Sequence, residues 1–488
     1  MNLRAVINIV SLLIVLIGFS MLGAAFAGKL AGDSHDQVFR FTECSLFIML
    51  VGLIVFLKTR DSKLSLGLRE GYAVVTLGWI AVAAVSGMPF PIITEGKVSF
   101  TDGFFEAMSG FTTTGSSILT DVEHGPCSKG LIFWRSLTNL LGGLGIVVMS
   151  MVLLPFLGSG GVQLFRAEST GTGGEQVTSR AVSTAKILWA LYFAMTVICI
   201  SIFRLLGMPW FDSFCHGMSA ISTGGYSSLN TSFMVGYGPA ILWVAITAQF
   251  ISGTNYILHV KALRGDWKCY WKDEEFRWYI AIYLVASLII AQQLMLRGTV
   301  ESASGAITHA AFQVVTIGTC CGFASMDFAV WPESCKMILI MMMLIGACSG
   351  STSGALKITR IILLAKYGWM KIKQVAHPRS IFSIHFNGNR VDDSLMHKIM
   401  IFTCLFIATW IAGAFLLSFA PGMSFEACIS GSLTCLANVG PGLAQVGPTC
   451  NFELLPDWAT WVCSLLMLLG RLEIFTVMIL LSPSLWRK

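Results

Sequence analysis

Ten apolar segments, most of them about twenty residues long, divide this chain and limit what it can fold into. A hydrocarbon core of roughly 30 Å is crossed by about 20 residues of α-helix. Only 12% of the residues are charged, whereas roughly a quarter are charged in an ordinary soluble domain. The sequence therefore predicts an all-α polytopic membrane protein. The predicted spans are 5–28, 38–57, 71–92, 131–157, 186–206, 237–260, 278–297, 334–365 (interrupted), 399–420 and 457–482.

The first apolar segment has two interpretations. Arg4 precedes it, and Ala25-Phe26-Ala27 resembles the small-residue site at which a secretory signal is cleaved. However, the segment runs for about 23 residues, longer than the apolar core of a usual signal peptide. We therefore expect a retained first helix.

Lysine and arginine residues gather in three loops, 58–70, 261–277 and 357–398, and are sparser in the loops that alternate with them. By the positive-inside rule, this bias places the amino and carboxyl termini in the cytoplasm. It also accounts for the net charge of +6. Because no basic stretch is interleaved with aromatic residues, we expect no nucleic-acid partner.

The chemistry-bearing residues favour neither an enzyme nor an organic cofactor. No Ser-His-Asp set, paired carboxylates or phosphate-binding loop stands out in the sequence. The fourteen cysteines contain no CxxC pair, which favours small buried thiols. Cys127 and Cys450 fall in predicted outer loops and could pair, but the sequence leaves this open.

Four shorter apolar pieces, rich in Gly, Ser and Thr, are too short to span and too apolar for free loops. "FFEAMSGFTTTGSS" (104–117) and "FCHGMSAISTGGYS" (214–227) align without a gap. "AFQVVTIGTCCGFA" (311–324) and "ISGSLTCLANVGPG" (429–442) match more weakly but keep one glycine in register. The four aligned glycines are Gly115, Gly225, Gly322 and Gly440.

Each piece lies between two predicted spans, so the repeating unit is helix, half-helix, extended loop, helix. We predict four such repeats in pseudo-fourfold arrangement around a central ion pore, with two extra amino-terminal helices. The predicted divisions are 1–70 (the extra helices), 71–162 (repeat 1), 163–276 (a cytoplasmic connection and repeat 2), 277–375 (repeat 3, with a broken second helix) and 376–488 (repeat 4).

Extended backbone at membrane depth is tolerated only where protein buries it or where it lines a water-filled path. Four such loops around one axis could direct carbonyl oxygens at a cation and replace its water shell. Glycine permits the backbone angles that such a loop needs. The carboxyl ends of the half-helices would add partial negative charge beside the cation.

Several motifs carry a resemblance to a known family. "NVGPG" (438–442) resembles the potassium-channel filter pattern T-V-G-Y-G. Together with the four repeats, "FWRSLTNLLGGLGIVVM" (133–149), "GACSGSTSGALKITR" (346–360) and "LGRLEIFTVMILLSP" (469–483) resemble the TrkH/TrkG/KtrB/HKT superfamily of potassium transporters. The resemblance covers essentially the whole chain, and the two extra helices are similar to the TrkH/TrkG branch.

The resemblance implies potassium uptake across a bacterial cytoplasmic membrane, with K⁺ as the transported ion bound at the filter. One departure is the third loop, where Cys320 and Cys321 stand at positions at which the family usually has Thr. The expected filter residues are Thr112, Thr113, Thr114, Gly115, Ser222, Thr223, Gly224, Gly225, Thr319, Cys320, Cys321, Gly322, Asn438, Val439 and Gly440.

The small polar stretch 346–354 interrupts the eighth span. It could serve close helix packing through small residues. The resemblance instead implies a flexible loop that blocks the pore below the filter. The expected gate residues are Gly346, Ser349, Gly350, Ser351, Thr352, Ser353, Gly354, Lys357 and Arg471.

Arg471 lies within an apolar run, where an ionised side chain needs water or a partner. Glu473 is its nearest acid in sequence, but residues two apart on a helix point to different sides. The resemblance places Arg471 in the permeation path, in contact with the intramembrane loop.

Asp102 and Asp212 are interpreted as helix caps rather than ion ligands. Glu106, His216 and Gln313 occupy equivalent half-helix positions, where we expect packing hydrogen bonds.

The resemblance also implies a homodimer with two pores, resting on a cytosolic ring of TrkA-like regulatory subunits that bind NAD or ATP. An ion-coupled symporter (H⁺ or Na⁺) with less selective K⁺/Na⁺ transport is the alternative, but its usual inverted repeats are not what this sequence shows. A receptor or scaffold without transport would leave the four loops unexplained.

Overall fold

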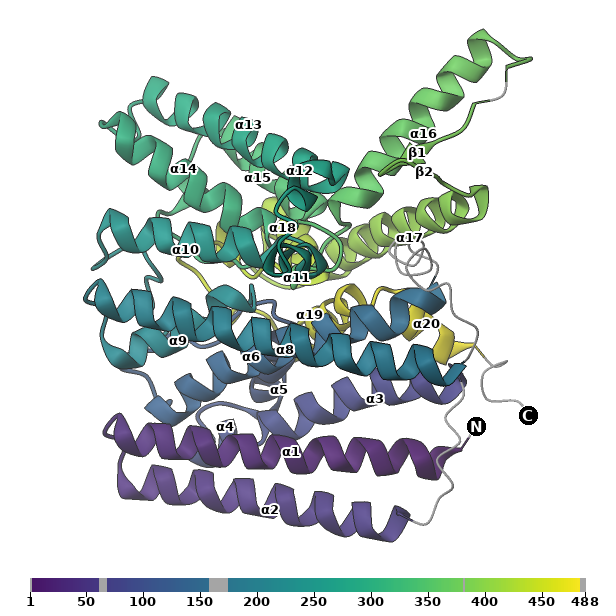
Figure 1. Cartoon of the computed structure of the whole chain (residues 1–488). Coiled ribbons are helices and arrows are strands. Elements are labelled where there is room, and N and C mark those ends of the chain that lie inside the picture. Colours follow the sequence, from purple (N-terminus) through teal and green to yellow (C-terminus); the bar gives the residue numbers. More distant parts are fainter. Residues whose placement is uncertain (1, 61–67, 158–173, 381, 483–488) are drawn as a thin grey trace.

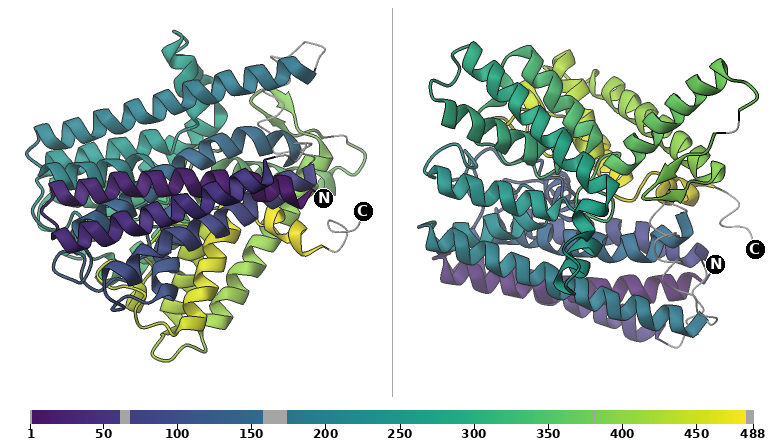
Figure 2. Two further views of the ribbon diagram at one scale, coloured as in Figure 1. Left: turned by 90° about the horizontal axis from the view of Figure 1, so that it is seen from below. Right: turned by 45° about the horizontal axis from the view of Figure 1, so that its top comes forward.

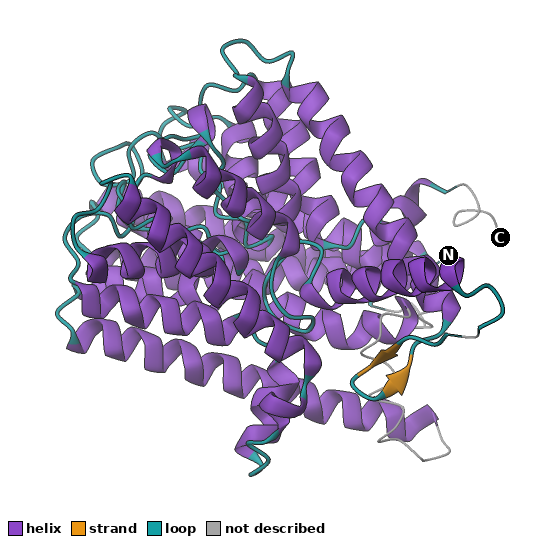
Figure 3. Cartoon of the chain, turned by 90° about the horizontal axis from the view of Figure 1, so that it is seen from above, coloured by secondary structure: helices purple, strands orange, loops and turns teal. Residues whose placement is uncertain are grey.

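The computed structural model describes residues 2–60, 68–157, 174–380 and 382–482. The predicted boundary between repeats 1 and 2, at 162–163, lies outside these ranges. The described part is built almost wholly from helices, drawn in purple in Figure 3. One short antiparallel hairpin, drawn in orange, pairs β1 (His385–Phe386) with β2 (Asn389–Arg390).

The helices follow the predicted order of spans and half-helices. They are α1 (Leu3–Leu30), α2 (His35–Thr59), α3 (Leu68–Gly87), α4 (Pro89–Ile93), α5 (Phe100–Phe111), α6 (Lys129–Leu157), α8 (Gly174–Leu205), α9 (Trp210–Ile221), α10 (Pro239–Ser252), α11 (Tyr256–Leu263), α12 (Cys269–Lys272), α13 (Glu274–Leu296), α14 (Ala303–Gly318), η1 (Phe328–Val330), α15 (Glu333–Ile345), α16 (Ile358–Ala376), α17 (Asp393–Leu417), α18 (Phe425–Ala437), η2 (Ala444–Val446), α19 (Asp457–Arg471) and α20 (Phe475–Leu481).

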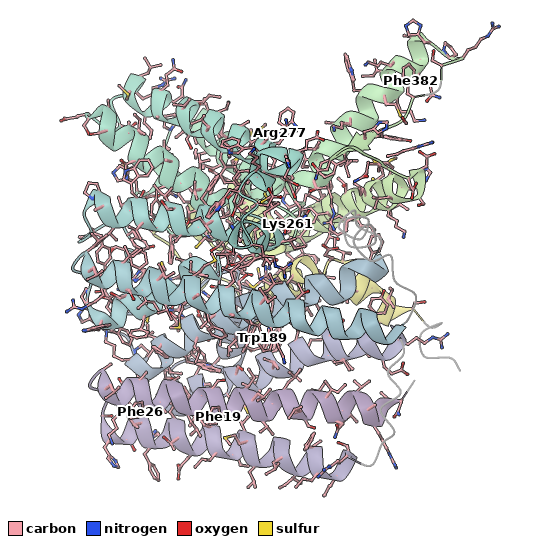
Figure 4. The ribbon with its side chains drawn as sticks, in the orientation of Figure 1. Phe19, Phe26, Trp189, Lys261, Arg277 and Phe382 are labelled. Carbon is pink, nitrogen blue, oxygen red and sulfur yellow. The ribbon has the colours of Figure 1, made fainter. Side chains whose placement is uncertain are left out.

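Six helices of the described part are long and apolar enough to cross a membrane, and the bent pair α10 and α11 would make a seventh. Large apolar side chains on them stay uncovered, which suits a lipid-facing surface. Phe19 and Phe26 of α1 and Trp189 of α8, labelled in Figure 4, are 65%, 60% and 44% exposed. The chain is a multi-pass membrane protein.

The first turn of α1 and the end of α20 lie at the same end of the bundle, on the right of Figure 1. We call this end the inner end and the opposite one the outer end. α1 and α2 pack against each other as one layer at the edge of the molecule, seen side by side from below in Figure 2. α1 also packs against α3 and α6, which joins the layer to repeat 1.

The other helices form four repeats closed into a ring. Each half-helix packs against a long helix of its own repeat and against one from the repeat before it: α9 against α6, α14 against α10, α18 against α15, and α5 against α19. The last of these contacts joins the carboxyl-terminal repeat back to the first. The arrangement of four helix–loop–helix repeats, predicted from the sequence, is confirmed.

Two of the predicted spans are broken where we expected continuous helices. Run 237–260 is divided at Gly253, and its halves α10 and α11 meet at 95°. Asn255 begins the second half, because its side chain accepts a hydrogen bond from the Ile257 amide at 2.9 Å. Run 457–482 is divided after Arg471, where Glu473 has a φ of 52°. The break predicted within 334–365 is present, between α15 and α16.

The helix-cap interpretation holds for Asp102 and not for Asp212. Ser99 is the N-cap of α5, and the Asp102 carboxylate completes a capping box by accepting from the Ser99 amide at 3.2 Å. Asp212 lies in the first turn of α9, whose N-cap is Pro209. It accepts instead from the Ser228 hydroxyl at 2.5 Å, so it holds the segment that follows the second loop.

Candidate functional site

The loops that follow the four half-helices share one backbone conformation. In each loop the glycine and the residue two positions before it both have positive φ, although the earlier residue is never glycine. The third loop keeps this geometry despite its two cysteines, because a backbone conformation does not require threonine. The φ values are 49° and 80° for Thr113 and Gly115, 52° and 74° for Thr223 and Gly225, 61° and 88° for Cys320 and Gly322, and 57° and 106° for Asn438 and Gly440.

The four loops meet in a closed ring, which we call the glycine ring. A Cβ added to any of its four glycines would come within 3.0 Å of a backbone carbonyl oxygen in the next repeat. Those oxygens belong to the residue just before the next glycine, and the fourth contact returns to the first repeat. The pairs are Gly115 with the Gly224 oxygen, Gly225 with Cys321, Gly322 with Val439, and Gly440 with Thr114.

The fifteen predicted filter residues are thus brought together in one place. Backbones of successive loops approach too closely for any side chain at the glycine positions, which explains the four glycines in register. Asn438 adds a tie across the ring, since its Nδ2 donates to Thr114 Oγ1 at 3.0 Å. Ser116 Oγ donates to the Gly440 oxygen at 2.9 Å, so both chain neighbours of Gly115 are bonded to repeat 4.

Equivalent half-helix positions brace the limb that leaves each loop, as expected. Gln313 accepts from the Ser325 amide at 3.0 Å. Glu106 accepts from the Ile118 amide at 2.7 Å, and His216 contacts the Ser227 hydroxyl at 3.0 Å. In repeat 4 the outgoing limb is held by Ser430, whose hydroxyl accepts from the Leu443 amide at 2.9 Å. Ser430 was not among the residues predicted from the sequence.

Repeat 1 contains a buried ion pair behind its loop. Arg135 Nε lies 2.7 Å from a Glu106 carboxylate oxygen, and both side chains are almost fully buried. The guanidinium also donates to Ser117 Oγ at 2.9 Å and lies over the ring of Tyr226, 4.1 Å from its centroid. Tyr226 in turn donates to the Glu106 backbone oxygen at 2.7 Å. The pair therefore holds the outgoing limb of loop 1 and part of repeat 2.

Hydrogen bonds at the outer end join all four neighbouring repeats. Repeats 1 and 2 meet where Asn230 Nδ2 donates to Asp121 at 2.8 Å, a bond that holds the pKa of the Asp121 carboxyl below its usual value. Repeats 2 and 3 are joined by the Phe233 amide, which donates to the Ala324 oxygen at 3.0 Å. The Thr449 hydroxyl of repeat 4 donates to the Asp327 carboxylate of repeat 3 at 3.3 Å, and the Phe452 amide of repeat 4 donates to the Ser117 oxygen of repeat 1 at 2.9 Å.

Residues 346–357, called the inner loop, lie directly on the inner side of the glycine ring. The Ala355 amide donates to the oxygen of Ala437, the last residue of α18, at 3.1 Å. Thr223 Oγ1 donates to Thr352 Oγ1 at 3.0 Å. A Cβ at Gly354 would collide with the Ala437 oxygen. The loop therefore touches the loops of repeats 2 and 4 on the inner side of the ring.

Arg471 contacts this loop and not its neighbour in sequence. Its Nη1 donates to the Thr352 oxygen at 2.8 Å. Glu473 instead pairs with Arg360 of α16 at 2.8 Å. The contact that the resemblance implied for Arg471 is present, and the alternative pair with Glu473 is absent from the described structure. Arg471 Nε and Nη2 are buried without a hydrogen-bond partner among the described residues.

The remaining predicted gate residues shape the inner loop itself. Gly346 and Gly350 have φ of 75° and 72°, which allow its turns. Lys357 Nζ donates to the hydroxyl of Ser353 at 3.1 Å and to its backbone oxygen. Ser351 bonds to the Ser353 hydroxyl at 2.8 Å.

Glu275 is a residue near this site that the sequence analysis missed. It is 4% exposed, and its carboxylate accepts from the amides of Ser349 and Thr359 at 2.7 and 3.2 Å. One signal was available, because Glu275 ends the run Asp273-Glu274-Glu275 that directly precedes an apolar span. The two outer-loop cysteines, Cys127 and Cys450, are free thiols in the described structure.

Comparison with known proteins places this architecture in a family. The sequence model of the TrkH family, described as a cation transport protein, matches residues 37–488. The chain belongs to the TrkH family. It is 35% identical to the Trk system potassium uptake protein TrkH of Vibrio parahaemolyticus, over 100% of both chains. It is 31% identical to the Trk system potassium uptake protein TrkG of Escherichia coli, over 92% of this chain and 93% of that protein.

A solved TrkH structure confirms the fold. The crystal structure of the potassium transporter TrkH from Vibrio parahaemolyticus matches with a TM-score of 0.90 and 32% identity, over 100% of both chains. The predicted all-α membrane fold and the predicted TrkH-type resemblance are therefore confirmed. Members of this family are transport proteins, which agrees with the expectation that the chain is not an enzyme.

Proposed function

We propose that this chain takes up potassium ions across the bacterial cytoplasmic membrane, with the glycine ring as its selectivity filter. The observation that carries the proposal is the closed ring, in which a carbonyl of each loop faces the glycine of the loop before it. Backbone carbonyls arranged around one axis can replace the water shell of K⁺. The carboxyl ends of α5, α9, α14 and α18 meet the ring and favour a cation there. Relatives named as potassium uptake proteins support K⁺ as the ion.

Growth of a potassium-uptake-deficient bacterial strain tests the transport proposal. We expect the chain to restore growth at low potassium and a Gly440→Ser variant, present in the membrane at the same level, to fail. If the inserted wild-type chain does not restore growth, the proposed substrate is wrong.

The inner loop is proposed to be the gate. It contacts two of the four loops of the ring, and Arg471 places a buried cation against it. A positive charge at this position opposes K⁺, while its hydrogen bond to Thr352 holds the loop in place.

Replacing Arg471 should therefore raise the flux. We expect Arg471→Met to increase K⁺ flux in proteoliposomes by roughly tenfold, since a charged hydrogen bond and a repelling charge are both lost. The measurement is uptake of ⁸⁶Rb⁺ at fixed protein density. Arg297→Met makes the same substitution at an exposed position just beyond the outer end of α13, and as the matched control it should leave the flux unchanged. A flux equal to wild type in Arg471→Met would contradict the role of Arg471 in gating.

The inner end is proposed to face the cytoplasm. This orientation rests on the basic loops 58–70, 261–277 and 357–398, by the positive-inside rule. Lys261 and Arg277, labelled in Figure 4, belong to the second of these loops. Reaction of a membrane-impermeant thiol reagent with an introduced cysteine at Lys371 from outside intact cells would contradict it.

The proposed partners are a second copy of this chain and a cytosolic ring of TrkA-like subunits that bind NAD or ATP. They are supported by the Trk system relatives, whose name refers to a multi-component system. α16 extends away from the bundle (Figure 1) and carries exposed Lys371 and Lys373 near its end. An acidic surface of a cytosolic partner would fit there.

Reversing these two charges tests the docking surface. We expect Lys371→Glu with Lys373→Glu to abolish co-purification of the cytosolic subunit, because like charges then face each other. The exposed outer-loop change Lys97→Glu is the control and should leave the complex intact. Undiminished co-purification of the double variant would show that the partner docks elsewhere.

A further inference from the structure

A single carboxylate holds both ends of the inner loop. Glu275 Oε1 accepts from the Ser349 amide, near the start of the loop, and from the Thr359 amide, just beyond its end. The hydroxyls of these two residues also meet, with Ser349 donating to Thr359 at 3.1 Å. Removing a buried acceptor that two amides share leaves both donors without a partner, which is costly. Glu275 is thus the point at which α13 grips the loop.

α13 is itself held in place at this end by the β hairpin. Its N-cap is Asp273, which accepts from the Phe276 amide at 2.8 Å. The other Asp273 oxygen accepts from Asn387 Nδ2 at 2.9 Å, and Asn387 Oδ1 accepts from the Glu274 amide at 2.7 Å. Asn387 therefore makes two hydrogen bonds to successive residues that lead directly to Glu275.

The hairpin is suited to present Asn387 rigidly. Asn387 and Gly388 form its two-residue turn with φ of 50° and 78°, the left-handed pair that such a tight turn needs. Lys366 of α16 holds the hairpin against α13, because its Nζ donates to the His385 oxygen at 2.8 Å and pairs with Glu274 at 2.5 Å. The turn side of the hairpin stays exposed, at Gly388, Asn389 and Arg390.

A continuous set of contacts consequently runs from an exposed surface to the glycine ring. It passes from Asn387 to the first turn of α13, from Glu275 to both ends of the inner loop, and from Thr352 to Thr223 of the ring. The three hydrogen bonds join buried or half-buried groups, and the backbone of α13 and of the inner loop connects one bond to the next.

We propose that Glu275 is the positioning residue of the inner loop, and that the β1–β2 hairpin, through Asn387, sets its position and so couples the inner surface to the gate. The proposal rests on the gating role given to the inner loop above. A displacement of the hairpin would tilt the first turn of α13 and release the two loop ends together.

The anchor is tested by flux measurements on the full chain in proteoliposomes. We expect Glu275→Ala to raise ⁸⁶Rb⁺ flux by roughly tenfold, because both hydrogen bonds to the loop ends are lost. Glu275→Gln keeps an acceptor oxygen and should restore most of the closure. Glu333→Gln, an exposed acid in the first turn of α15, is the control and should behave as wild type.

The hairpin is tested without changing a buried residue. Asn387→Asp loses the donor to Asp273 and adds a like charge beside it, so we expect a clear rise in flux. Asn389→Asp makes the same chemical change two residues away, at an exposed position, and should have no effect. Because both variants alter the same hairpin, a difference between them reports on the Asn387 contacts and not on charge in general.

The outcomes separate this inference from the proposed function. A wild-type chain that conducts, with unchanged flux in both Glu275→Ala and Asn387→Asp, would overturn the inference and leave potassium transport standing. If flux rises in Glu275→Ala and stays at the wild-type level in Asn387→Asp, then Glu275 positions the inner loop but the hairpin does not control it. A wild-type chain with no flux would end both.

Discussion

Gly225→Ala is expected to abolish potassium uptake. Gly225 has a φ of 74°, and a Cβ there would collide with the Cys321 backbone oxygen in the next repeat. The left-handed conformation alone costs a non-glycine residue on the order of 1–3 kcal/mol. The collision is the larger effect, because the atom that must move is a backbone oxygen of the proposed filter. Relief would displace loop 3 and separate the carbonyls that we propose replace the water shell of K⁺.

Gly298→Ala is the matched control for this prediction. Gly298 has a similar φ of 66°, but a Cβ at that position meets nothing within 4 Å. Both variants carry the backbone strain, and only Gly225→Ala carries the collision. The measurement is ⁸⁶Rb⁺ uptake in proteoliposomes, with protein that elutes as a single species and keeps its melting temperature. Uptake at the wild-type rate by Gly225→Ala would show that the glycine ring does not lie in the permeation path.

The ring could be predicted from the sequence because its cause is local. A glycine in register after each half-helix reflects a backbone conformation that each loop adopts for itself, and the same spacing recurs four times. Cys320 shows that the prediction depended on the backbone rather than on side-chain identity, since its φ of 61° matches that of Thr113 and Thr223. The pairing of each glycine with a particular carbonyl could not be predicted, because it depends on how the four repeats close into a ring.

The contacts that hold the inner loop could not be predicted, because they join distant parts of the chain. Glu275 binds residues 74 and 84 positions away. The breaks after Gly253 and Arg471 were missed for the same reason. The Cys348 amide of the inner loop donates to the Gly253 oxygen at 3.0 Å, and Glu473, whose φ is 52°, pairs with Arg360 of α16. Apolar periodicity reports where a span lies and does not report what interrupts it.

Glu106→Gln is expected to be among the most destabilising single changes in the described structure. It would leave the Arg135 guanidinium buried without its countercharge, and breaking a buried ion pair in this way costs about 3–5 kcal/mol. The same change weakens the acceptor of the Ser117 hydroxyl and the Ile118 amide, which lie three residues or fewer beyond Gly115. We therefore expect the free energy of unfolding to decrease and loop 1 to lose its position in the same variant. The measurement is the free energy of unfolding in mixed micelles.

The double variant Glu106→Gln with Arg135→Met separates the charge from the packing. Removing both charges leaves no uncompensated ion, so we expect it to recover much of the stability lost in Glu106→Gln. Uptake should recover less, because Arg135 also donates to Ser117 and lies over the Tyr226 ring, contacts that methionine cannot replace. Arg40→Met, which breaks partly exposed pairs with Asp36 and Glu95, is the control and should change little. If Glu106→Gln unfolds like wild type, then the pair does not hold loop 1, and the carbonyls of repeat 1 must be positioned by the bonds across the ring from Asn438 and Ser116.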